Sequence, residues 1–454
     1  MDSLRERATE LVRLLRGRGH AAYWVGGCVR DLEMGREPHD YDIVTDALPS
    51  QVQAYFPDAL LVGARFGVVV VPFGDHHFEI STFRAEGPYL DGRRPSSVEF
   101  VDARTDVQRR DFTINGLLHD PLTSTTIDYV GGREDIARRL VRAIGDPAAR
   151  FLEDRLRMLR AVRLACELGF EVEPATFAAV RARAETVALV SAERIRDEIQ
   201  RTLVSPGRGR GVRLMHESGL LAAILPEVEA MVGVAQPPEF HPEGDVFTHT
   251  ALVLESLREP HPVLAMAALL HDVGKPPTYA EADRIRFNGH DEVGARMAEA
   301  ICRRLRVSGQ DTARIVALVR DHLRVKDLPR MRPARAARFL LQDDAEDHLE
   351  LHRADCLASH GDLSVYEWAM AAREARRREH PPRAPLLTGD DLIVMGYRPG
   401  PRFKEMLEAV LDGQLEGTLR TADDARAFLR RAYGPGEGSS PPGGKPLRRG
   451  DGGA

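Results

Sequence analysis

Lysine is almost absent from this chain of 454 residues, so arginine carries nearly all of its positive charge. The only lysines are Lys275, Lys326, Lys404 and Lys445. The net charge is −6 and the pI is about 6.3. This balance excludes a protein that binds nucleic acid through overall positive charge, and contact with a polyanion has to come from a local patch.

Cysteine and long apolar runs are also scarce. The four cysteines are far apart and form no Cys-x-x-Cys pair, which argues against a disulfide framework or a zinc ribbon and indicates a reducing compartment. The longest apolar run, VLAMAALL, is too short to span a bilayer. The charged N-terminal segment is unlike a secretory signal. We therefore expect a cytoplasmic protein with no membrane partner.

The pattern of apolar residues changes along the chain. Strand-like runs occur in residues 1–147, whereas helical periodicity dominates up to about residue 432. Proline-rich breaks fall at 236–245 and 379–391. The sequence predicts a mixed α/β region over 1–147, then all-α regions over 148–235, 236–380 and 381–433, and a disordered end over 434–454.

The stretch PHDYDIVTDALPS, residues 38–50, places Asp40 and Asp42 at the start of a β-branched run. Residues two apart on a strand point to the same face, so the two carboxylates would converge and need a counter-charge such as Mg²⁺. Glu79 is a candidate third acid, although an exposed strand glutamate explains it equally well. A turn with a solvated Asp42 is the alternative interpretation.

Features around this acidic pair suit a nucleotide phosphate. A Gly-Gly turn ending at Gly27 lies between a strand and a helix start, where backbone N–H groups approach an anion, and Arg30 follows in the first turn. Arg109 and Arg110 are suited to clamp a triphosphate. A surface ion pair with Asp111 is the alternative for these arginines.

Four charged residues recur every three positions in FLEDRLRMLRAVRLA, and we expect them along one helix: Asp154, Arg157, Arg160 and Arg163. An arginine beside an aspartate supplies the donors and the acceptor that the Watson–Crick edge of a nucleobase requires, and the further arginines could hold phosphates. The alternative is a set of helix-surface ion pairs from Glu153 or Asp154 to Arg157.

Histidines and aspartates recur on the helical segments after residue 245. They are His249, His271, Asp272, His290, His322 and Asp355. Such residues at spaced helical positions suit a transition metal or a mixed nitrogen and oxygen site. A core histidine with a polar partner is the alternative for a single His-Asp pair.

Five segments resemble, in order, the motifs of class II tRNA nucleotidyltransferases, which are the CCA-adding enzymes and the related bacterial poly(A) polymerases. The segments are GGCVRDLEMGREPHDYDIVT, RRDFTIN, IDYVGGREDI, IGDPAARFLEDRLRMLRAVRLA and SAERIRDE. The histidine and aspartate set resembles the HD phosphohydrolase superfamily. The resemblance implies an α/β nucleotidyltransferase palm as head, followed by an all-α neck, an HD body and a tail.

This resemblance implies roles for the residues of the head. Asp40 and Asp42 would bind two Mg²⁺ ions during attack of an RNA 3′-hydroxyl on the α-phosphate of CTP or ATP. Gly27, Arg30 and Arg110 would hold the triphosphate. The RNA partner would be tRNA, contacted at its 3′ end and acceptor region.

The resemblance also implies which residues select the base and which hold the HD metal. Asp154 and Arg157 would read the base, with Arg160 and Arg163 in support. The core HD ligands would be His249, His271, Asp272 and Asp355, and a second metal could be completed by His290 and His322.

Three features bear on the choice among related activities. The loop over 85–100 is shortened in CC-only enzymes, so its presence favours a final A-addition. Arg155 and Gly116 depart from the usual proline and alanine of the family, and Arg155 neighbours the base-reading pair. A poly(A) polymerase or an A-adding enzyme shares every motif, and an HD phosphohydrolase with the palm as an RNA-binding module is a further hypothesis. The sequence does not predict the oligomeric state.

Overall fold

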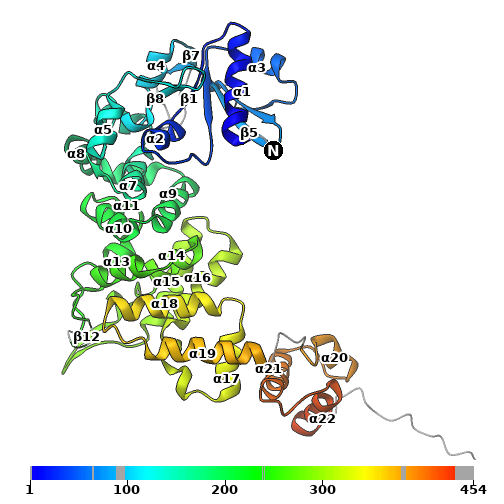
Figure 1. Ribbon diagram of the computed structural model, residues 1–454. Coiled ribbons are helices and arrows are strands. Elements are labelled where there is room, and N and C mark those ends of the chain that lie inside the picture. Colours follow the sequence, from blue (N-terminus) through cyan, green and yellow to red (C-terminus); the bar gives the residue numbers. More distant parts are fainter. Residues whose placement is uncertain are drawn as a thin grey trace, which may run out of the picture. The chain divides into compact units, whose positions relative to one another are not determined.

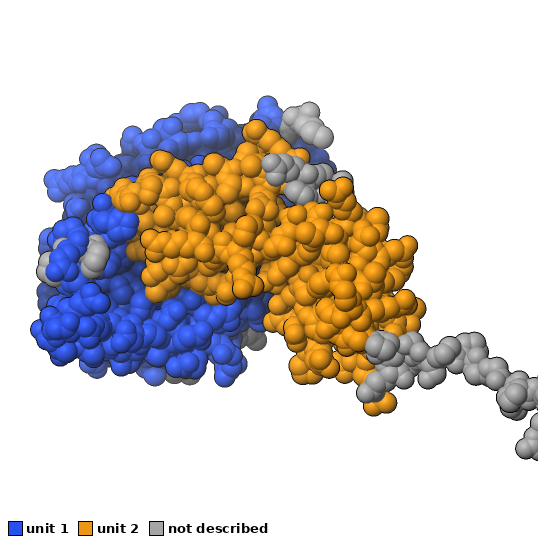
Figure 2. Space-filling model, turned by 90° about the horizontal axis from the view of Figure 1, so that it is seen from below, with its two compact units in different colours: residues 1–320, 357–360 blue, residues 321–356, 361–454 orange. Residues whose placement is uncertain are grey.

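The computed structural model describes residues 3–63, 66–87, 98–237, 239, 241–379 and 385–434. The chain forms two compact units, residues 1–320 with 357–360 and residues 321–356 with 361–454 (Figure 2). Within the described ranges, no helix combines the length and the apolar character needed to cross a membrane. Most of the predicted loop over 85–100, and the predicted disordered end apart from Gly434, lie outside the described residues.

The first unit begins with a seven-stranded sheet in the order β3-β4-β5-β2-β1-β8-β9. Figure 1 labels β1, β5 and β8 of this sheet. Its strands are β1 (Ala22–Val25), β2 (Asp42–Thr45), β3 (Leu60–Gly63), β4 (Val68–Phe73), β5 (His76–Thr82), β8 (Leu117–Asp120) and β9 (Thr125–Asp128). β2 and β5 are parallel and the other neighbours are antiparallel. A separate antiparallel pair is formed by β6 (Arg84–Glu86) and β7 (Val98–Phe100). The predicted mixed α/β head is confirmed.

Short helices accompany this sheet. They are α1 (Leu4–Gly17), α2 (Gly27–Glu33), α3 (Pro49–Tyr55), α4 (Ala103–Gln108), α5 (Gly132–Arg138) and the 3-10 helix η2 (Thr113–Asn115). α1 begins at Leu4 because Ser3 and Glu6 form a reciprocal capping box. Its buried face shares one apolar cluster with Trp24 and Ile43 of the sheet, which fixes the strands that carry the acidic residues.

Helices dominate after residue 147, as predicted. The following helices are α6 (Pro147–Glu153), α7 (Arg157–Leu168), α8 (Pro174–Arg183), η3 (Ala184–Leu189), α9 (Ala192–Val204), α10 (Arg208–Glu217), α11 (Leu220–Ile224) and α12 (Pro226–Glu229). Two observations correct the prediction. β11 (Glu171–Val172), inside the region expected to be helical, pairs in parallel with β10 (Leu140–Val141) of the mixed α/β region. The single helix expected through residues 154–163 is broken before α7.

A second apolar cluster joins the head to this helical region. Phe112 and Ile114, which follow the arginine pair Arg109 and Arg110, are fully buried against Ala161, Leu164 and Ala165 of α7. Burying large apolar side chains is the main favourable term in folding. The segment around residues 112–114 and α7 are therefore held as one packed body.

The HD region and the C-terminal helices complete the chain. The first unit continues with α13 (Val246–Ser256), α14 (Pro262–Leu270), η4 (Pro276–Thr278), β12 (Tyr279–Glu281), β13 (Ile285–Phe287), α15 (His290–Arg304) and α16 (Gly309–Asp321). The second unit contains η5 (His322–Arg330), α17 (Pro333–Leu341), α18 (Ala345–Ala358), α19 (Ser364–Glu379), α20 (Gly389–Val394), α21 (Pro401–Leu415) and α22 (Ala422–Tyr433). The antiparallel β12–β13 pair also corrects the all-helical prediction.

Gly116, one of the two departures from the resembled family, lies where its neighbours already fill the space. A Cβ atom added there would lie 2.8 Å from Val130 Cγ2, 3.1 Å from Ile144 Cδ1 and 3.2 Å from Val107 Cγ1. We expect Gly116→Ala to lower the free energy of unfolding by about 1–3 kcal/mol, because overpacking forces the surrounding atoms to shift. Urea unfolding measures the change. Gly17→Ala is the control, since an added Cβ meets no atom within 4 Å there, and equal losses in both variants would contradict the packing argument.

Candidate active site

Acidic side chains gather where β2 begins. Asp42 is the exposed first residue of β2, and the parallel pairing of β2 with β5 places it beside Glu79. Although the residue is exposed at the strand end, nearby protein partly withdraws its carboxylate from water. This effect and the negative charges of Asp40 and Glu79 raise the pKa of Asp42 to about 6, while Arg110 opposes the shift. Asp40 precedes the strand instead of lying in it. The two predicted carboxylates are thus brought together, by a strand and the loop before it.

Positive charge and a tight turn lie directly against this cluster. Gly26 has a φ of +84°, a conformation that favours glycine. A Cβ atom at Gly26 would lie 3.8 Å from Asp42 Oδ2 and 4.0 Å from Arg110 Nη1, so the turn runs between these two side chains. Gly27 begins α2, and a Cβ atom there would lie 3.6 Å from Arg30 Nη2. The predicted glycine turn and Arg110 therefore lie beside the acidic cluster, whereas Arg30, next to Gly27, binds Asp31 Oδ1 through its Nε at 2.9 Å and its Nη2 at 2.8 Å.

Asp106 holds the neighbouring arginines Arg109 and Arg110 in place. This fully buried carboxylate accepts hydrogen bonds from Arg109 Nη2 at 2.7 Å and from Arg110 Nη2 at 3.0 Å. It also accepts the backbone N–H of Arg84 at 3.1 Å. Burial would raise the pKa of Asp106, but the neighbouring Arg110 and Arg109 outweigh it and hold the pKa below its usual range.

Asp154 lies in the break between α6 and α7, not on a helix. Its backbone is extended, and its Oδ1 accepts the Leu156 N–H at 3.1 Å, so the side chain competes with helical hydrogen bonding. Among the described residues, the ion pair between Asp154 and Arg157, which was the alternative interpretation, is not formed. Instead Arg194 of α9 binds the carboxylate with a fork of two hydrogen bonds, from Nη1 to Oδ1 at 3.2 Å and from Nη2 to Oδ2 at 2.7 Å.

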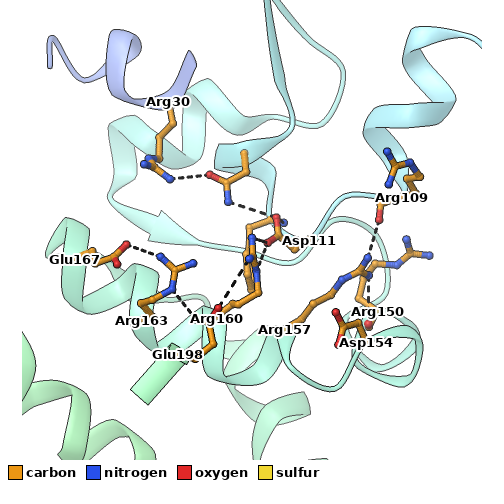
Figure 3. Close-up of polar contacts among 12 residues, drawn as sticks. Arg30, Arg109, Asp111, Arg150, Asp154, Arg157, Arg160, Arg163, Glu167 and Glu198 are labelled. Atoms are coloured by element: carbon orange, nitrogen blue, oxygen red, sulfur yellow. Dashed lines mark hydrogen bonds and ion pairs between the residues drawn. The ribbon is translucent and has the colours of Figure 1, made fainter. Parts of the chain in front are cut away.

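Arg157 begins α7 and points toward the head (Figure 3). Its Nη1 donates to Glu153 Oε2 at 2.7 Å, the ion pair expected from the sequence, and to the Arg150 carbonyl at 3.3 Å. Its Nη2 donates to the Arg109 carbonyl at 3.1 Å. The guanidinium of Arg157 thus contacts the backbone next to Arg110.

Arg160 belongs to a polar chain that crosses from α7 into the head (Figure 3). Its Nη2 lies 2.6 Å from Asp111 Oδ2, Asn115 donates to the same carboxyl group at 3.4 Å, and Arg30 donates to Asn115 at 2.9 Å. Burial would raise the pKa of Asp111, but the charges of Arg160 and Arg157 hold it at about 2. Arg160 is therefore ion-paired with Asp111, and Asp111 and Asn115 link it to Arg30 by hydrogen bonds.

Arg163 is buried in ion pairs. Its Nε donates to Glu198 Oε2 at 2.6 Å and its Nη1 donates to Glu167 Oε2 at 2.7 Å. Figure 3 shows Arg163 directed at these two acids. Glu198, on α9, also lies 4.0 Å from Arg160. The arginine stripe thus faces acidic partners along most of its length.

Sequence reasoning missed four residues that hold the predicted ones. They are Asp106, Asn115, Arg194 and Glu198. Asp106 had a detectable signal, because an acid three and four positions before two arginines on a helix end is suited to bind both. Arg194 and Glu198 lie on another helix, and only the fold brings them to Asp154 and Arg163.

A second candidate site lies among the HD residues of the first unit. His249 Nε2, His271 Nε2 and His290 Nε2 lie 3.9, 3.2 and 3.6 Å from the carboxylate of Asp272. The Nδ1 atoms of His271 and His290 contact the backbone carbonyls of Ala268 and Phe287 at 2.8 and 2.7 Å. Such contacts fix the tautomer in which Nε2 has the lone pair, which is how histidine binds metals.

This donor set fits a divalent metal. Three imidazole nitrogens and a carboxylate suit zinc, nickel, iron or copper better than magnesium. Lys275 Nζ lies 2.6 Å from Asp272 Oδ2 and provides the positive charge at this buried carboxylate. Of the other predicted ligands, His322 begins η5 and Asp355 lies on α18, both in the second unit.

Glu243 orients the first of these histidines, and its substitution should weaken metal binding. Glu243 Oε1 lies 2.6 Å from His249 Nδ1 and 2.9 Å from His241 Nδ1. We expect Glu243→Gln to weaken the affinity for Co²⁺ or Mn²⁺ by about 10- to 100-fold, the usual effect of losing such a carboxylate.

Calorimetric titration in an Asp42→Asn background, which removes the other acidic site, measures this affinity. Glu229→Gln is the matched control, because Glu229 pairs with His216 at 2.9 Å outside the cluster. Equal affinities in the Glu243 and Glu229 variants would contradict the role of Glu243.

A mixed sheet that places paired carboxylates, a glycine turn and arginines together is the arrangement of a nucleotidyltransferase. More specifically, the chain belongs to the tRNA nucleotidyltransferase family. It is 34% identical over 421 residues to a CC-adding tRNA nucleotidyltransferase of Thermus thermophilus, covering 90% of this chain and 93% of the relative. The resemblance inferred from the five motifs is confirmed.

Family models match three parts of the chain. They are the poly A polymerase head domain over residues 22–142, the "Probable RNA and SrmB- binding site of polymerase A" over 169–232, and the HD domain over 246–359. These matches fall inside the head, neck and HD regions expected from the sequence.

Relatives that are named CCA-adding enzymes give further matches. The enzyme of Bacillus licheniformis is 43% identical over 221 residues, which is 48% of this chain and 55% of the relative. The chain thus spans about half the length of the curated CCA-adding relatives that it matches. The crystal structure of the Bacillus stearothermophilus CCA-adding enzyme in complex with CTP matches with a TM-score of 0.72 and 28% identity, over 95% of this chain and 98% of that one.

Proposed function

We propose that this protein adds C and A to the 3′ ends of tRNA from CTP and ATP, without a nucleic-acid template. The observation that carries the proposal is the position of Asp42 and Arg110 on either side of Gly26. The Asp42 carboxylate, which would bind a cation, and the Arg110 guanidinium, which would bind an anion, are then close enough to act on the same nucleotide phosphates. We place the protein in the cytoplasm, where these substrates occur.

Asp40 and Asp42 are the residues that would hold Mg²⁺. The fit rests on their oxygen donors, which magnesium prefers, and on the raised pKa of Asp42, which results from burial of its carboxylate and from the like charges of Asp40 and Glu79. When bound, magnesium supplies charge stabilisation for the attacking and leaving oxygens. Glu79 adds a third carboxylate to the same cluster.

The arginines and the glycine turn would bind the triphosphate. Arg110 is aimed past Gly26 because Asp106 holds its Nε and Nη2, and its Nη1 lies nearest the turn. Gly27 and Arg30 of α2 would bind the phosphates next to this turn, with the Arg30 guanidinium held by Asp31 and Asn115. Arg160 and Arg163 would support this binding through their ion pairs, since Arg160 reaches Arg30 by way of Asp111.

Hydrogen-bond counts at the base-reading pair favour C and A. Within the described residues, Asp154 accepts three hydrogen bonds, and a carboxylate has about four acceptor positions, so one remains. Arg157 donates three hydrogen bonds and has two N–H donors left of five. One acceptor beside two donors matches the amino group, N3 and O2 of cytosine. Adenine, with its amino group and N1, uses one of each.

The reaction follows from these placements. The 3′-hydroxyl of the RNA attacks the α-phosphate, the bond to the β-phosphate breaks, and pyrophosphate leaves. The protein contributes mainly by positioning and by fixed positive charge, as in other phosphoryl transfers. Arg110 would neutralise the charge that develops on the leaving pyrophosphate.

Purified protein and three tRNA transcripts, which end before CCA, after C and after CC, test the proposal. Each transcript receives CTP, ATP or both with Mg²⁺. Addition of three nucleotides to the first transcript, and no more, is the expected result. Two C residues only would give the activity named for the Thermus relative, a single A only an A-adding enzyme, and a long ATP-dependent ladder a poly(A) polymerase. No addition would overturn the proposal.

A second activity is favoured by the three histidine Nε2 atoms around Asp272. We propose that the HD site binds a divalent transition metal and hydrolyses phosphoesters of RNA or nucleotides. Hydrolysis of a chromogenic phosphodiester by cobalt-loaded protein tests it. His271→Ala should abolish hydrolysis and leave nucleotide addition unchanged, and hydrolysis that survives this substitution would assign it elsewhere.

A further inference from the structure

Arg194 determines which acceptor positions of Asp154 are available. Its two terminal nitrogens bind the two carboxylate oxygens separately, at 3.2 and 2.7 Å. The Leu156 N–H takes a second position on Oδ1. Both side chains are largely withdrawn from solvent, with 25% of Arg194 and 17% of Asp154 exposed. The one remaining acceptor position therefore belongs to Oδ2.

A carboxylate without this fork would have a different hydrogen-bonding preference. Two free oxygens accept two parallel N–H donors, and such bidentate pairs are strong and geometrically specific. Guanine presents that pair on its Watson–Crick edge, at N1 and at the amino group on C2, beside the acceptor O6. Asp154 with both oxygens available and Arg157 with one donor would match guanine completely.

We propose that Arg194 is a specificity-determining positioning residue that excludes GTP by occupying both oxygens of Asp154. The inference rests on the proposed reading of the base by Asp154 and Arg157. Arg194 leaves one acceptor position on Asp154. That position accepts one amino hydrogen of cytosine or adenine, whereas one of the two guanine donors would stay unpaired. Rejecting the wrong partner by an unsatisfied polar group is an effective form of specificity.

Uracil provides an internal control for this argument. Its edge has one N–H donor, N3, between two carbonyl oxygens. A second free oxygen on Asp154 offers uracil no further hydrogen bond. Removal of Arg194 should therefore increase the use of GTP much more than the use of UTP, whereas a general loosening of the site would increase both.

The experiment measures kcat/KM for each of the four nucleoside triphosphates on transcripts that end before CCA and after CC. The variants are Arg194→Ala, which frees one acceptor position on each oxygen, and Arg194→Lys, which keeps a charge but binds at most one of the two oxygens. We expect Arg194→Ala to raise the GTP-to-ATP ratio of kcat/KM by about ten-fold or more, the scale of one bidentate contact to a base. Arg194→Lys should give a smaller rise, and the UTP-to-CTP ratio should change less than the GTP-to-ATP ratio in both.

Arg196→Ala is the matched control. Arg196 lies on the same helix, but its side chain binds Asp197 and the Arg306 carbonyl and does not contact Asp154. This control should keep the wild-type ratios. Thermal melting identifies any variant that fails to fold, and Arg194→Lys then provides the test because it retains the positive charge at Asp154.

The outcomes separate this inference from the proposed function. If wild-type protein adds neither C nor A, the proposed function fails. If wild-type protein adds both but Asp154→Ala leaves the four-nucleotide preference intact, Asp154 does not read the base. If Asp154→Ala disturbs the preference while folded Arg194 variants leave the GTP-to-ATP ratio unchanged, or lose both nucleotides equally, the role of Arg194 is overturned.

Discussion

Asp42→Asn should abolish nucleotide addition and, at neutral pH, raise the melting temperature of the metal-free protein. Addition should fall about a thousand-fold or more, because losing a metal-binding carboxylate removes several kcal/mol of charge stabilisation from the transition state. Stability should rise because the substitution removes a charge that burial and the like charges of Asp40 and Glu79 disfavour. Functional sites commonly trade stability for activity in this way.

The gain in stability should depend on pH. The pKa of Asp42 is raised from 3.8 to about 6 in the folded protein. Between these values the folded protein binds more protons than the unfolded chain, so its stability falls as the pH rises. The advantage of Asp42→Asn should therefore be full above pH 6 and disappear below about pH 4. Melting temperatures of both proteins, measured with a chelator across this interval, give the profile.

Asp46→Asn is the matched control, because Asp46 directly follows the same strand and binds His20 and the Ala21 N–H, away from the acidic cluster. It should retain nucleotide addition. Addition that persists in Asp42→Asn would refute the metal-binding role, and a stability difference that is the same at every pH would refute the cost assigned to the Asp42 charge.

Glu198→Ala should lower the free energy of unfolding by about 3–5 kcal/mol, the cost of leaving a buried charge without its partner. Glu198 and Arg163 lie 2.6 Å apart with only 7% and 8% of their side chains exposed. Denaturant unfolding, followed by circular dichroism, measures the loss. Glu134→Ala removes a comparable pair with Arg138 that is 65% and 61% exposed, and should cost less than about 1 kcal/mol.

A double variant sharpens this test. Arg163→Met with Glu198→Leu replaces both charges by apolar side chains and should recover much of the stability, since the remaining penalty of an unpaired charge is gone. A loss in Glu198→Ala no larger than in Glu134→Ala would mean that the buried pair does not hold the helices together. Recovery in the double variant would mean that the loss in Glu198→Ala comes from the unpaired charge of Arg163.

The sequence was sufficient to predict the division into a mixed head and helical regions. Strands such as β2 and β4 are strongly β-branched, and α1 and α7 have clear helical periodicity. The two-residue pair β10 and β11 and the three-residue pair β12 and β13 could not be predicted, because such short runs have no detectable alternation. The break at Asp154 was missed because side-chain competition for the Leu156 N–H overrides a helical pattern.

The candidate site was predicted only in part for a related reason. Asp40, Asp42 and Arg110 lie in short motifs whose residue types indicate metal binding and triphosphate binding. Side chains that orient them, such as Asp106 and Arg194, are ordinary charged residues in the sequence. Their partners are set by packing between elements distant in the chain, as when α9 brings Arg194 to Asp154 across 40 positions.

Three neck arginines bind one short head segment, residues 108–111. Arg150 and Arg157 donate to the carbonyls of its first two residues, and Arg160 binds the carboxylate of its last. Arg110 lies within this segment. A tilt of the neck that improves the contacts of Arg157 with a base therefore also moves the Arg110 guanidinium, which would bind the triphosphate. Cooperativity of this kind is reciprocal: the free energy by which a matching base strengthens the hold on the triphosphate equals the free energy by which a bound triphosphate strengthens the hold on that base.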